Sequence, residues 1–203
     1  MIVKNASKAV AALAATLTLT TLMGCAHPPG SQTQANFVDI GLIAFNDFHG
    51  NLEPPHIAVP IPSQQGVERV PYLASAIAQL KARHPHHAVI TAGDMVSASP
   101  LVSALFLDEP TIEAVNHMQI DFSAVGNHEF DRGWQELLRL QQGGCEKFTV
   151  REPCQISKPF EGAKFRFLAA NTVREDGQPL LPATGIKRFT QGDATVAVGF
   201  IGM

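Results

Sequence analysis

The sequence has few basic residues, few cysteines and no long apolar run. Its 203 residues include 15 Lys and Arg against 18 Asp and Glu, a net charge of −3. A nucleic-acid polymer is therefore not the expected partner, because such binding depends on a basic surface. The apolar segment at residues 9–23 is shorter than the ~20 residues of a membrane-spanning helix. The 45% hydrophobic fraction excludes a disordered chain and is sufficient for a folded core.

The N-terminal segment has the pattern of an export signal. Lys4 and Lys8 precede the uncharged segment 9–23, and a basic region before a short apolar region is typical of secreted proteins. We predict a signal peptide over residues 1–24 and a flexible linker over residues 25–36, which are rich in polar residues and proline. The alternative is a buried helix of the domain, which the polar linker disfavours.

The end of this segment, Leu22-Met23-Gly24-Cys25, resembles the lipobox of bacterial lipoproteins. The resemblance implies that Cys25 carries acyl chains, and several chains on one residue anchor a protein stably to a membrane. Ala26 after the cysteine implies the outer membrane, with the domain in the periplasm of the bacterial cell envelope. Met23 replaces the small residue usual at its position, so cleavage without acylation stays open.

Cys145 and Cys154, the other two cysteines, lie in a polar loop. An exported protein folds in an oxidising compartment, so we predict a disulfide between them that staples this loop. Zinc binding is the alternative, although the loop has no histidine and no second cysteine pair.

Strand-like and helix-like segments alternate along residues 37–203, and this alternation predicts a layered α/β domain. Apolar runs predict strands at residues 37–45, 88–91, 122–125 and 165–170. Apolar faces predict helices that begin at Pro71 and span residues 110–118 and 132–142. A β-hairpin is expected from residues 185–189 and 195–201. We expect residues 196–203 to form a buried strand, which indicates a domain that continues past Met203.

Polar residues follow three of the predicted strands, in the segments 46–51, 93–94 and 126–131. The carboxyl ends of parallel strands form the ligand-binding edge of an α/β sheet, so these segments should converge. Asp47 and His49 are two residues apart, and in extended backbone their side chains point to the same side. A carboxylate with an imidazole suits a divalent transition metal, Asp94 has two oxygens to bridge two ions, and Asn127 adds a neutral oxygen. The alternative for each segment alone is an exposed turn.

These segments resemble the first three signature blocks of the calcineurin-like metallophosphoesterases, and segments 46–52 and 126–131 resemble the 5′-nucleotidase branch in particular. The resemblance extends from about residue 40 to residue 203. It implies the N-terminal part of a four-layer α/β/β/α sandwich with two divalent ions, such as Zn, Mn or Co. The resemblance implies that Asp47 and His49 bind the first ion, that Asp94 bridges the two ions and that Asn127 binds the second. It also implies that His128 is the catalytic histidine and that Asp131 is its carboxylate partner.

The resemblance implies an exported phosphoesterase that hydrolyses small nucleotide phosphate esters with a metal-activated water. A 2′,3′-cyclic-nucleotide or sugar-nucleotide phosphoesterase is one alternative. The other is a truncated, non-catalytic lipoprotein, because the family's two later histidine ligands and its C-terminal domain have no counterpart up to Met203. The histidines at positions 56, 84, 86, 87 and 117 lie in predicted loops or on a helix and are poor substitutes.

Overall fold

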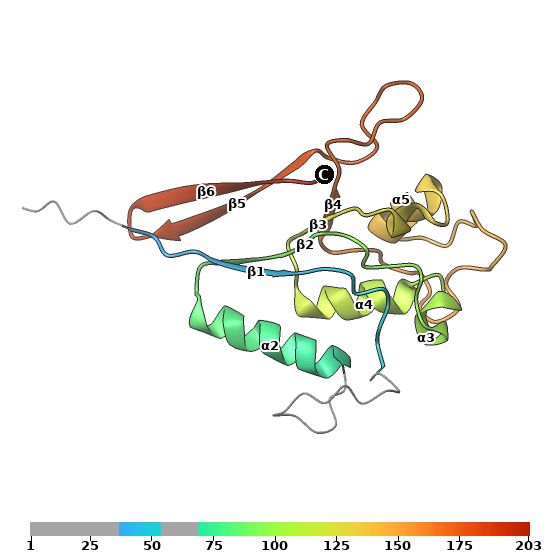
Figure 1. Ribbon diagram of the computed structural model, residues 1–203, viewed down its shortest axis with the longest axis horizontal. Coiled ribbons are helices and arrows are strands. Elements are labelled where there is room, and N and C mark those ends of the chain that lie inside the picture. The colour runs from blue at the N-terminus through green and yellow to red at the C-terminus, as the bar shows by residue number, and fades with distance from the viewer. Residues whose placement is uncertain (1–36, 54–68) are drawn as a thin grey trace, which may run out of the picture. The chain divides into compact units, whose positions relative to one another are not determined.

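A four-stranded parallel sheet organises the structure, with strand order β1-β2-β3-β4 (Figure 1). The strands are β1 (Gly41–Phe45), β2 (His87–Thr91), β3 (Phe122–Ala124) and β4 (Arg166–Leu168). Helical segments join consecutive strands, as parallel pairing requires. They are α2 (Arg69–Arg83), then α3 (Leu101–Ala104) and α4 (Glu109–Met118), and finally the 3₁₀ helix η1 (His128–Phe130) and α5 (Trp134–Gln142).

The computed structural model describes residues 37–53 and 69–203. The predicted signal peptide, Cys25, the predicted linker and His56 lie outside the described residues. None of the described helices has both the length and the apolar composition that crossing a bilayer requires.

The helices pack on one face of the sheet because their apolar residues recur at helical spacing. Ile112 and Val115 of α4 and Leu137 of α5 are completely buried, and they join Val89 and Phe167 of the sheet in one core cluster. Each such side chain contributes roughly 1.5–3 kcal/mol when it leaves water. This core holds the strands in place, and it therefore also fixes where the loops at their carboxyl ends begin.

A hairpin of β5 (Thr184–Gln191) and β6 (Ala194–Ile201) packs on the opposite face. The ring of Phe200 lies 5.2 Å from that of Phe122 on β3, and Lys187 Nζ lies 2.7 Å from Asp121 Oδ1. Gly185 lies so close to the Phe122 ring that a side chain there would collide with it. The described residues therefore form helix, sheet and hairpin layers, in agreement with the predicted α/β sandwich.

The order and type of the predicted elements are correct, and the predicted disulfide joins Cys145 to Cys154. The structure corrects two expectations. β1 begins at Gly41 and is an edge strand rather than a buried one, with Leu42 60% exposed. β6 is also largely exposed, with Ile201 at 68%, because the hairpin meets the sheet through one face only. The short α3 and η1 were not predicted, since a single turn has no apolar period.

Candidate metal centre

Three loops meet at the carboxyl ends of β1, β2 and β3. Backbone hydrogen bonds join the first two loops: the N–H of Asp47 donates to Gly93 O (3.2 Å), that of His49 to Asp94 O (3.0 Å) and that of Gly50 to Met95 O (3.1 Å). The third loop approaches so closely that a Cβ on Gly126 would collide with the Asp94 carboxylate. Convergence of these segments, predicted from the strand ends, is confirmed.

Potential ligand atoms gather where the loops meet. Metal-binding atoms of His49, Asp94 and His128 all lie within 4.8 Å of one another. Asp47 lies at the edge of this group, with its Oδ1 3.9 Å from His49 Nε2. The His49 and His128 rings are nearly perpendicular, with centroids 4.8 Å apart. Asn127 is exposed and directly precedes η1, which carries His128.

The backbone of this region is strained. Asp47 has φ of 53°, His49 of 46° and Asp94 of 54°, all in the left-handed region that non-glycine residues rarely adopt. Each such conformation costs about 1–3 kcal/mol, and such residues cluster at functional sites. The expected extended backbone at Asp47 and His49 is therefore wrong. Their side chains approach each other because of tight turns and not because of strand alternation.

The hydrogen bonds of His49 prepare it to bind a cation. Its Nδ1 lies 3.0 Å from Ser97 O, and since a carbonyl oxygen only accepts, Nδ1 carries the proton. In the neutral ring the lone pair is then on Nε2, the nitrogen nearest Asp47. This is the usual arrangement of metal-binding histidines, whose second nitrogen donates to a carbonyl or carboxylate. The donor set therefore fits a divalent cation.

His128 has a different environment. Its Nδ1 lies 2.8 Å from Asp131 Oδ2, and this hydrogen bond raises the pKa of His128 above its ordinary value. The negative charges of Asp131, Asp94 and Glu129 act in the same direction and outweigh partial desolvation. The geometry thus favours a protonated ring beside the carboxylate of Asp94.

Glu129 has a structural role that the sequence did not reveal. Its side chain is 3% exposed, and its carboxylate accepts the N–H groups of Asp94 (2.9 Å), Met95 (2.8 Å) and Gly126 (2.6 Å). Burial raises the pKa of Glu129, and the backbone hydrogen bonds oppose that shift. One carboxylate thus fastens the second loop to the third. The only signal in the sequence was its place beside Asn127 and His128.

Asp108 supports the site from further away. It is completely buried and accepts the backbone N–H of Ser97 (2.9 Å), the Ser103 hydroxyl (2.6 Å) and the Arg132 guanidinium. Burial alone would raise the pKa of Asp108, but the hydrogen bonds from Ser103 and Arg132 outweigh burial, and its pKa lies below the ordinary value. Since Ser97 O accepts from His49, this network holds the orientation of the His49 ring.

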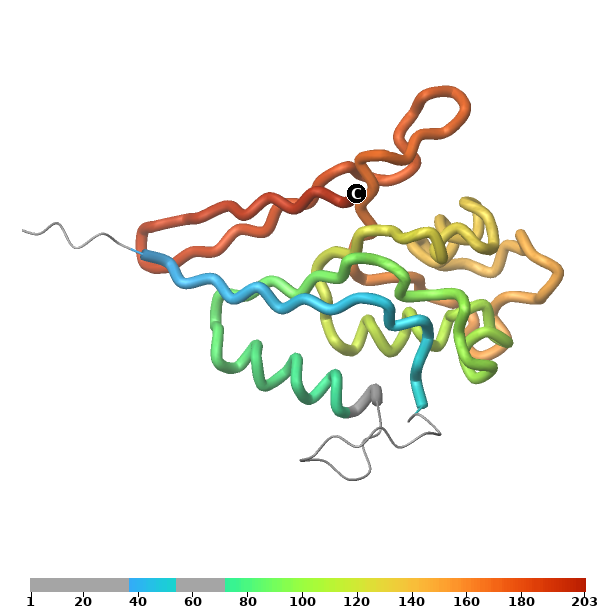
Figure 2. Tube along the Cα trace, in the orientation of Figure 1, coloured from blue at the N-terminus to red at the C-terminus, as the bar shows by residue number. Residues whose placement is uncertain are grey.

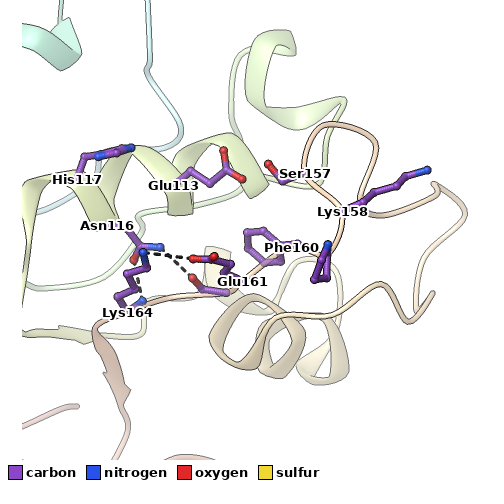
Figure 3. A pocket seen from close by; sticks show the side chains of 10 residues that line it. Glu113, Asn116, His117, Ser157, Lys158, Phe160, Glu161 and Lys164 are labelled. Carbon is purple, nitrogen blue, oxygen red and sulfur yellow. Dashed lines mark hydrogen bonds and ion pairs between the residues drawn. The ribbon is translucent and has the colours of Figure 1, made fainter.

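A separate cavity of about 550 Å³ lies between α4 and residues 157–164 (Figure 3). Its charges are of both signs, and Lys164 and Glu161 form an ion pair of 3.2 Å. The Asn116 amide is engaged by the backbone of Gly162 and Lys164. The cavity shares no lining residue with the strand-end cluster. We therefore assign the candidate chemistry to the cluster.

No family model matches the chain. It is 49% identical over 187 residues to the uncharacterized protein in the pqq-V 5′ region of Acinetobacter calcoaceticus, an alignment that covers 85% of this chain and 92% of that protein. It is 32% identical to endonuclease YhcR of Bacillus subtilis over 82% of this chain and 13% of YhcR. It is 30% identical to the probable 5′-nucleotidase of Treponema pallidum over 57% of this chain and 19% of that protein.

Two solved structures show the fold. The calcineurin-like phosphoesterase YfkN of Bacillus subtilis matches with a TM-score of 0.53 and 21% identity, over 79% of this chain and 46% of that one. The 5′-nucleotidase precursor of Thermus thermophilus matches with a TM-score of 0.55 and 22% identity, over 80% and 28%. The chain thus spans less than half of these two proteins. It belongs to the same family as the Acinetobacter calcoaceticus protein, and it has the fold of the N-terminal part of the calcineurin-like phosphoesterases, 5′-nucleotidases among them.

Proposed function

We propose that the chain is an exported, metal-dependent phosphoesterase that hydrolyses phosphate esters of nucleotides. The observation that carries this proposal is the gathering of His49, Asp94 and His128 ligand atoms within 4.8 Å at the ends of parallel strands. The name of the Treponema pallidum relative supports a nucleotide substrate. A small molecule is favoured over a polymer because the net charge is −3.

The proposed centre holds two divalent ions. Asp47 and His49 would bind the first, Asp94 would bridge, and Asn127 would bind the second, with Zn, Mn and Co all compatible with these donors. When bound, such ions supply positive charge that acidifies a water and neutralises the phosphoryl oxygens. The left-handed turns at Asp47, His49 and Asp94 and the His49–Ser97 hydrogen bond support this assignment, because they orient these side chains toward the site without a bound ion.

His128 is the proposed acid. Asp131 accepts from Nδ1–H, so the second proton of the imidazolium is on Nε2. That proton can hydrogen-bond to a phosphoryl oxygen and then pass to the leaving alkoxide. The hydrogen bond to Asp131 holds the ring in place. Asp131 also lies beside the N-terminus of α5, where the helix dipole stabilises a carboxylate.

The direct test is phosphate release by the purified chain supplied with Mn²⁺, Co²⁺ or Zn²⁺. We expect release from AMP that depends on the ion and stops with a chelator. A 2′,3′-cyclic nucleotide, a sugar nucleotide and single-stranded DNA serve as comparison substrates, the last because one relative is named an endonuclease. Preference for a cyclic or sugar nucleotide would favour the alternative substrates. No release from any substrate would favour a non-catalytic lipoprotein.

Two variants separate the roles of the residues. His128→Asn should lower turnover about 10²- to 10⁴-fold, the usual contribution of a general acid, while the bound metal measured by mass spectrometry stays constant. Asp47→Asn should lower both the turnover and the amount of bound metal. His117→Asn, on α4, is the matched control and should change neither. Equal loss of metal and turnover in His128→Asn would make His128 a ligand.

Export and anchoring form a separate part of the proposal. When a bacterium that expresses the chain grows in the presence of a labelled fatty acid, we expect the label on Cys25 and the protein in the outer-membrane fraction. Cys25→Ala should lose the label and the membrane association. Release of an unlabelled, shortened protein into the periplasm would instead indicate cleavage without acylation.

A further inference from the structure

The turn that joins α3 to α4, residues 107–109, has a strained backbone. Leu107 has φ of 57° and Asp108 of 61°, so two consecutive non-glycine residues lie in the left-handed region. Such a conformation persists only when the surrounding structure holds it. The contacts that hold it here come from two buried carboxylates, those of Asp108 and Glu109, which face different neighbours.

Asp108 connects the turn to the candidate metal centre. Its Oδ2 accepts the backbone N–H of Ser97 at 2.9 Å, and the carbonyl oxygen of Ser97 lies 3.0 Å from His49 Nδ1. Ser97 is itself left-handed, with φ of 64°. The residue that accepts the His49 proton thus depends on the Asp108 carboxylate for its own strained conformation.

Glu109 connects the same turn to the disulfide loop, residues 145–154. The segment that follows α5 passes the start of α4 (Figure 2), and the N–H of Cys154 donates to Glu109 Oε1 at 2.9 Å. Arg139 donates to the same oxygen at 2.7 Å and to Gly144 O at 3.1 Å. Glu109 is 1% exposed, and its Oε2 has no hydrogen-bond partner among the described residues. The position of this carboxylate therefore depends on Arg139 and on the disulfide loop.

The disulfide fixes the end of the loop that contacts Glu109. It joins Cys145 to Cys154, with their Cα atoms 5.5 Å apart. Cys154 is 1% exposed and left-handed, with φ of 56°. Without the covalent bond, Cys154 is free to relax, and its N–H then moves away from Glu109. The turn at residues 107–109 would lose one of its two supports while its strain remained.

We propose that Glu109 is a positioning residue of the candidate metal centre, and that the Cys145–Cys154 disulfide holds it in place. With both supports, the turn keeps Ser97 directed at His49. With one support, the turn relaxes and Ser97 is released. The inference rests on the proposed function for the metal ion that His49 would bind.

The first test is Mn²⁺ binding to the purified chain, followed by the EPR signal of free Mn²⁺. The variant Cys145→Ser/Cys154→Ser should bind Mn²⁺ about tenfold more weakly than the wild type, as expected if about one molecule in ten keeps the competent turn. Glu109→Gln should also weaken binding, because it removes the charge that pairs with Arg139. It keeps the disulfide, so it tests the same support if the double variant does not fold.

The second test needs no metal. Because the N–H of Ser97 donates to Asp108, NMR should show faster hydrogen exchange at Ser97 in both variants. The matched control is Phe200→Leu, which removes the ring contact with Phe122 on the hairpin side of the sheet. This control loses stability far from the turn, and it should change neither the Mn²⁺ affinity nor the exchange at Ser97.

Wild-type Mn²⁺ affinity in either variant would overturn the inference and leave the proposed metal centre intact. Equal changes in the variants and in Phe200→Leu would also overturn it, since general loss of stability would then be the cause. If the wild type binds no Mn²⁺, the proposed function fails and exchange at Ser97 decides. Faster exchange in the variants would then support the positioning of Ser97 by Glu109, and unchanged exchange would refute it.

Discussion

Removal of the Glu129 carboxylate should loosen the junction of the second and third loops. Oε2 accepts from the N–H groups of Asp94 and Gly126, and Oε1 accepts from that of Met95. A buried donor that loses its acceptor costs about 1–3 kcal/mol. Glu129→Ala strips three donors, so we expect a loss of at least about 3 kcal/mol in the free energy of unfolding. Glu129→Gln keeps the oxygen at the position of Oε2 and strips one donor, so about 1–3 kcal/mol should be lost.

The measurement is urea unfolding of the purified chain, followed by far-UV circular dichroism. The order of stability should be wild type, then Glu129→Gln, then Glu129→Ala. Glu146→Ala is the control, since Glu146 is an exposed residue of the disulfide loop. With a total stability of about 5–15 kcal/mol, Glu129→Ala approaches the limit of folding, and Glu129→Gln keeps the test informative. If Glu129→Ala were as stable as Glu146→Ala, the carboxylate would not hold the loops together.

Three further outcomes follow from the same contacts. Asp108→Asn should cost about 3 kcal/mol near neutral pH, because it breaks a buried ion pair. Since the folded pKa of Asp108 is lowered, its stabilisation is present above the unfolded pKa near 3.8 and disappears as the pH falls through the folded pKa. The stability difference between wild type and variant, measured by urea unfolding at each pH, should therefore shrink in acid. Reduction of the Cys145–Cys154 disulfide should cost roughly 2.5 kcal/mol, as expected for its short loop, and calorimetry with and without reductant measures this. Gly126→Ala should displace the Asp94 carboxylate and lower metal affinity by calorimetric titration, and unchanged affinity would exclude the predicted collision.

The sequence predicted the order of strands and helices well, because apolar periodicity reflects burial on one face of each element. It overestimated burial in β1 and β6. Apolar composition does not reveal whether a strand lies at a sheet edge or has only one covered face, and Leu42 and Ile201 are exposed for these reasons. The long-range contacts of the site were also predicted only in part. Polar residues after strand ends predicted the convergence of Asp47, Asp94 and His128, but not the left-handed backbone of Asp47, His49 and Asp94.

The acids of this region divide into two groups by what their oxygens contact. Both oxygens of Glu129 are occupied by backbone N–H groups, which agrees with a structural role. Within the described residues, the Asp94 carboxylate accepts one hydrogen bond, from the His128 N–H at 3.2 Å. Asp94 therefore retains acceptor capacity beside His49 and His128, although its backbone is strained. The surrounding loops hold the strained backbone of Asp94 in this conformation, here through the hydrogen bonds of Glu129. A bound cation is the partner that would use the free acceptor capacity of the Asp94 carboxylate.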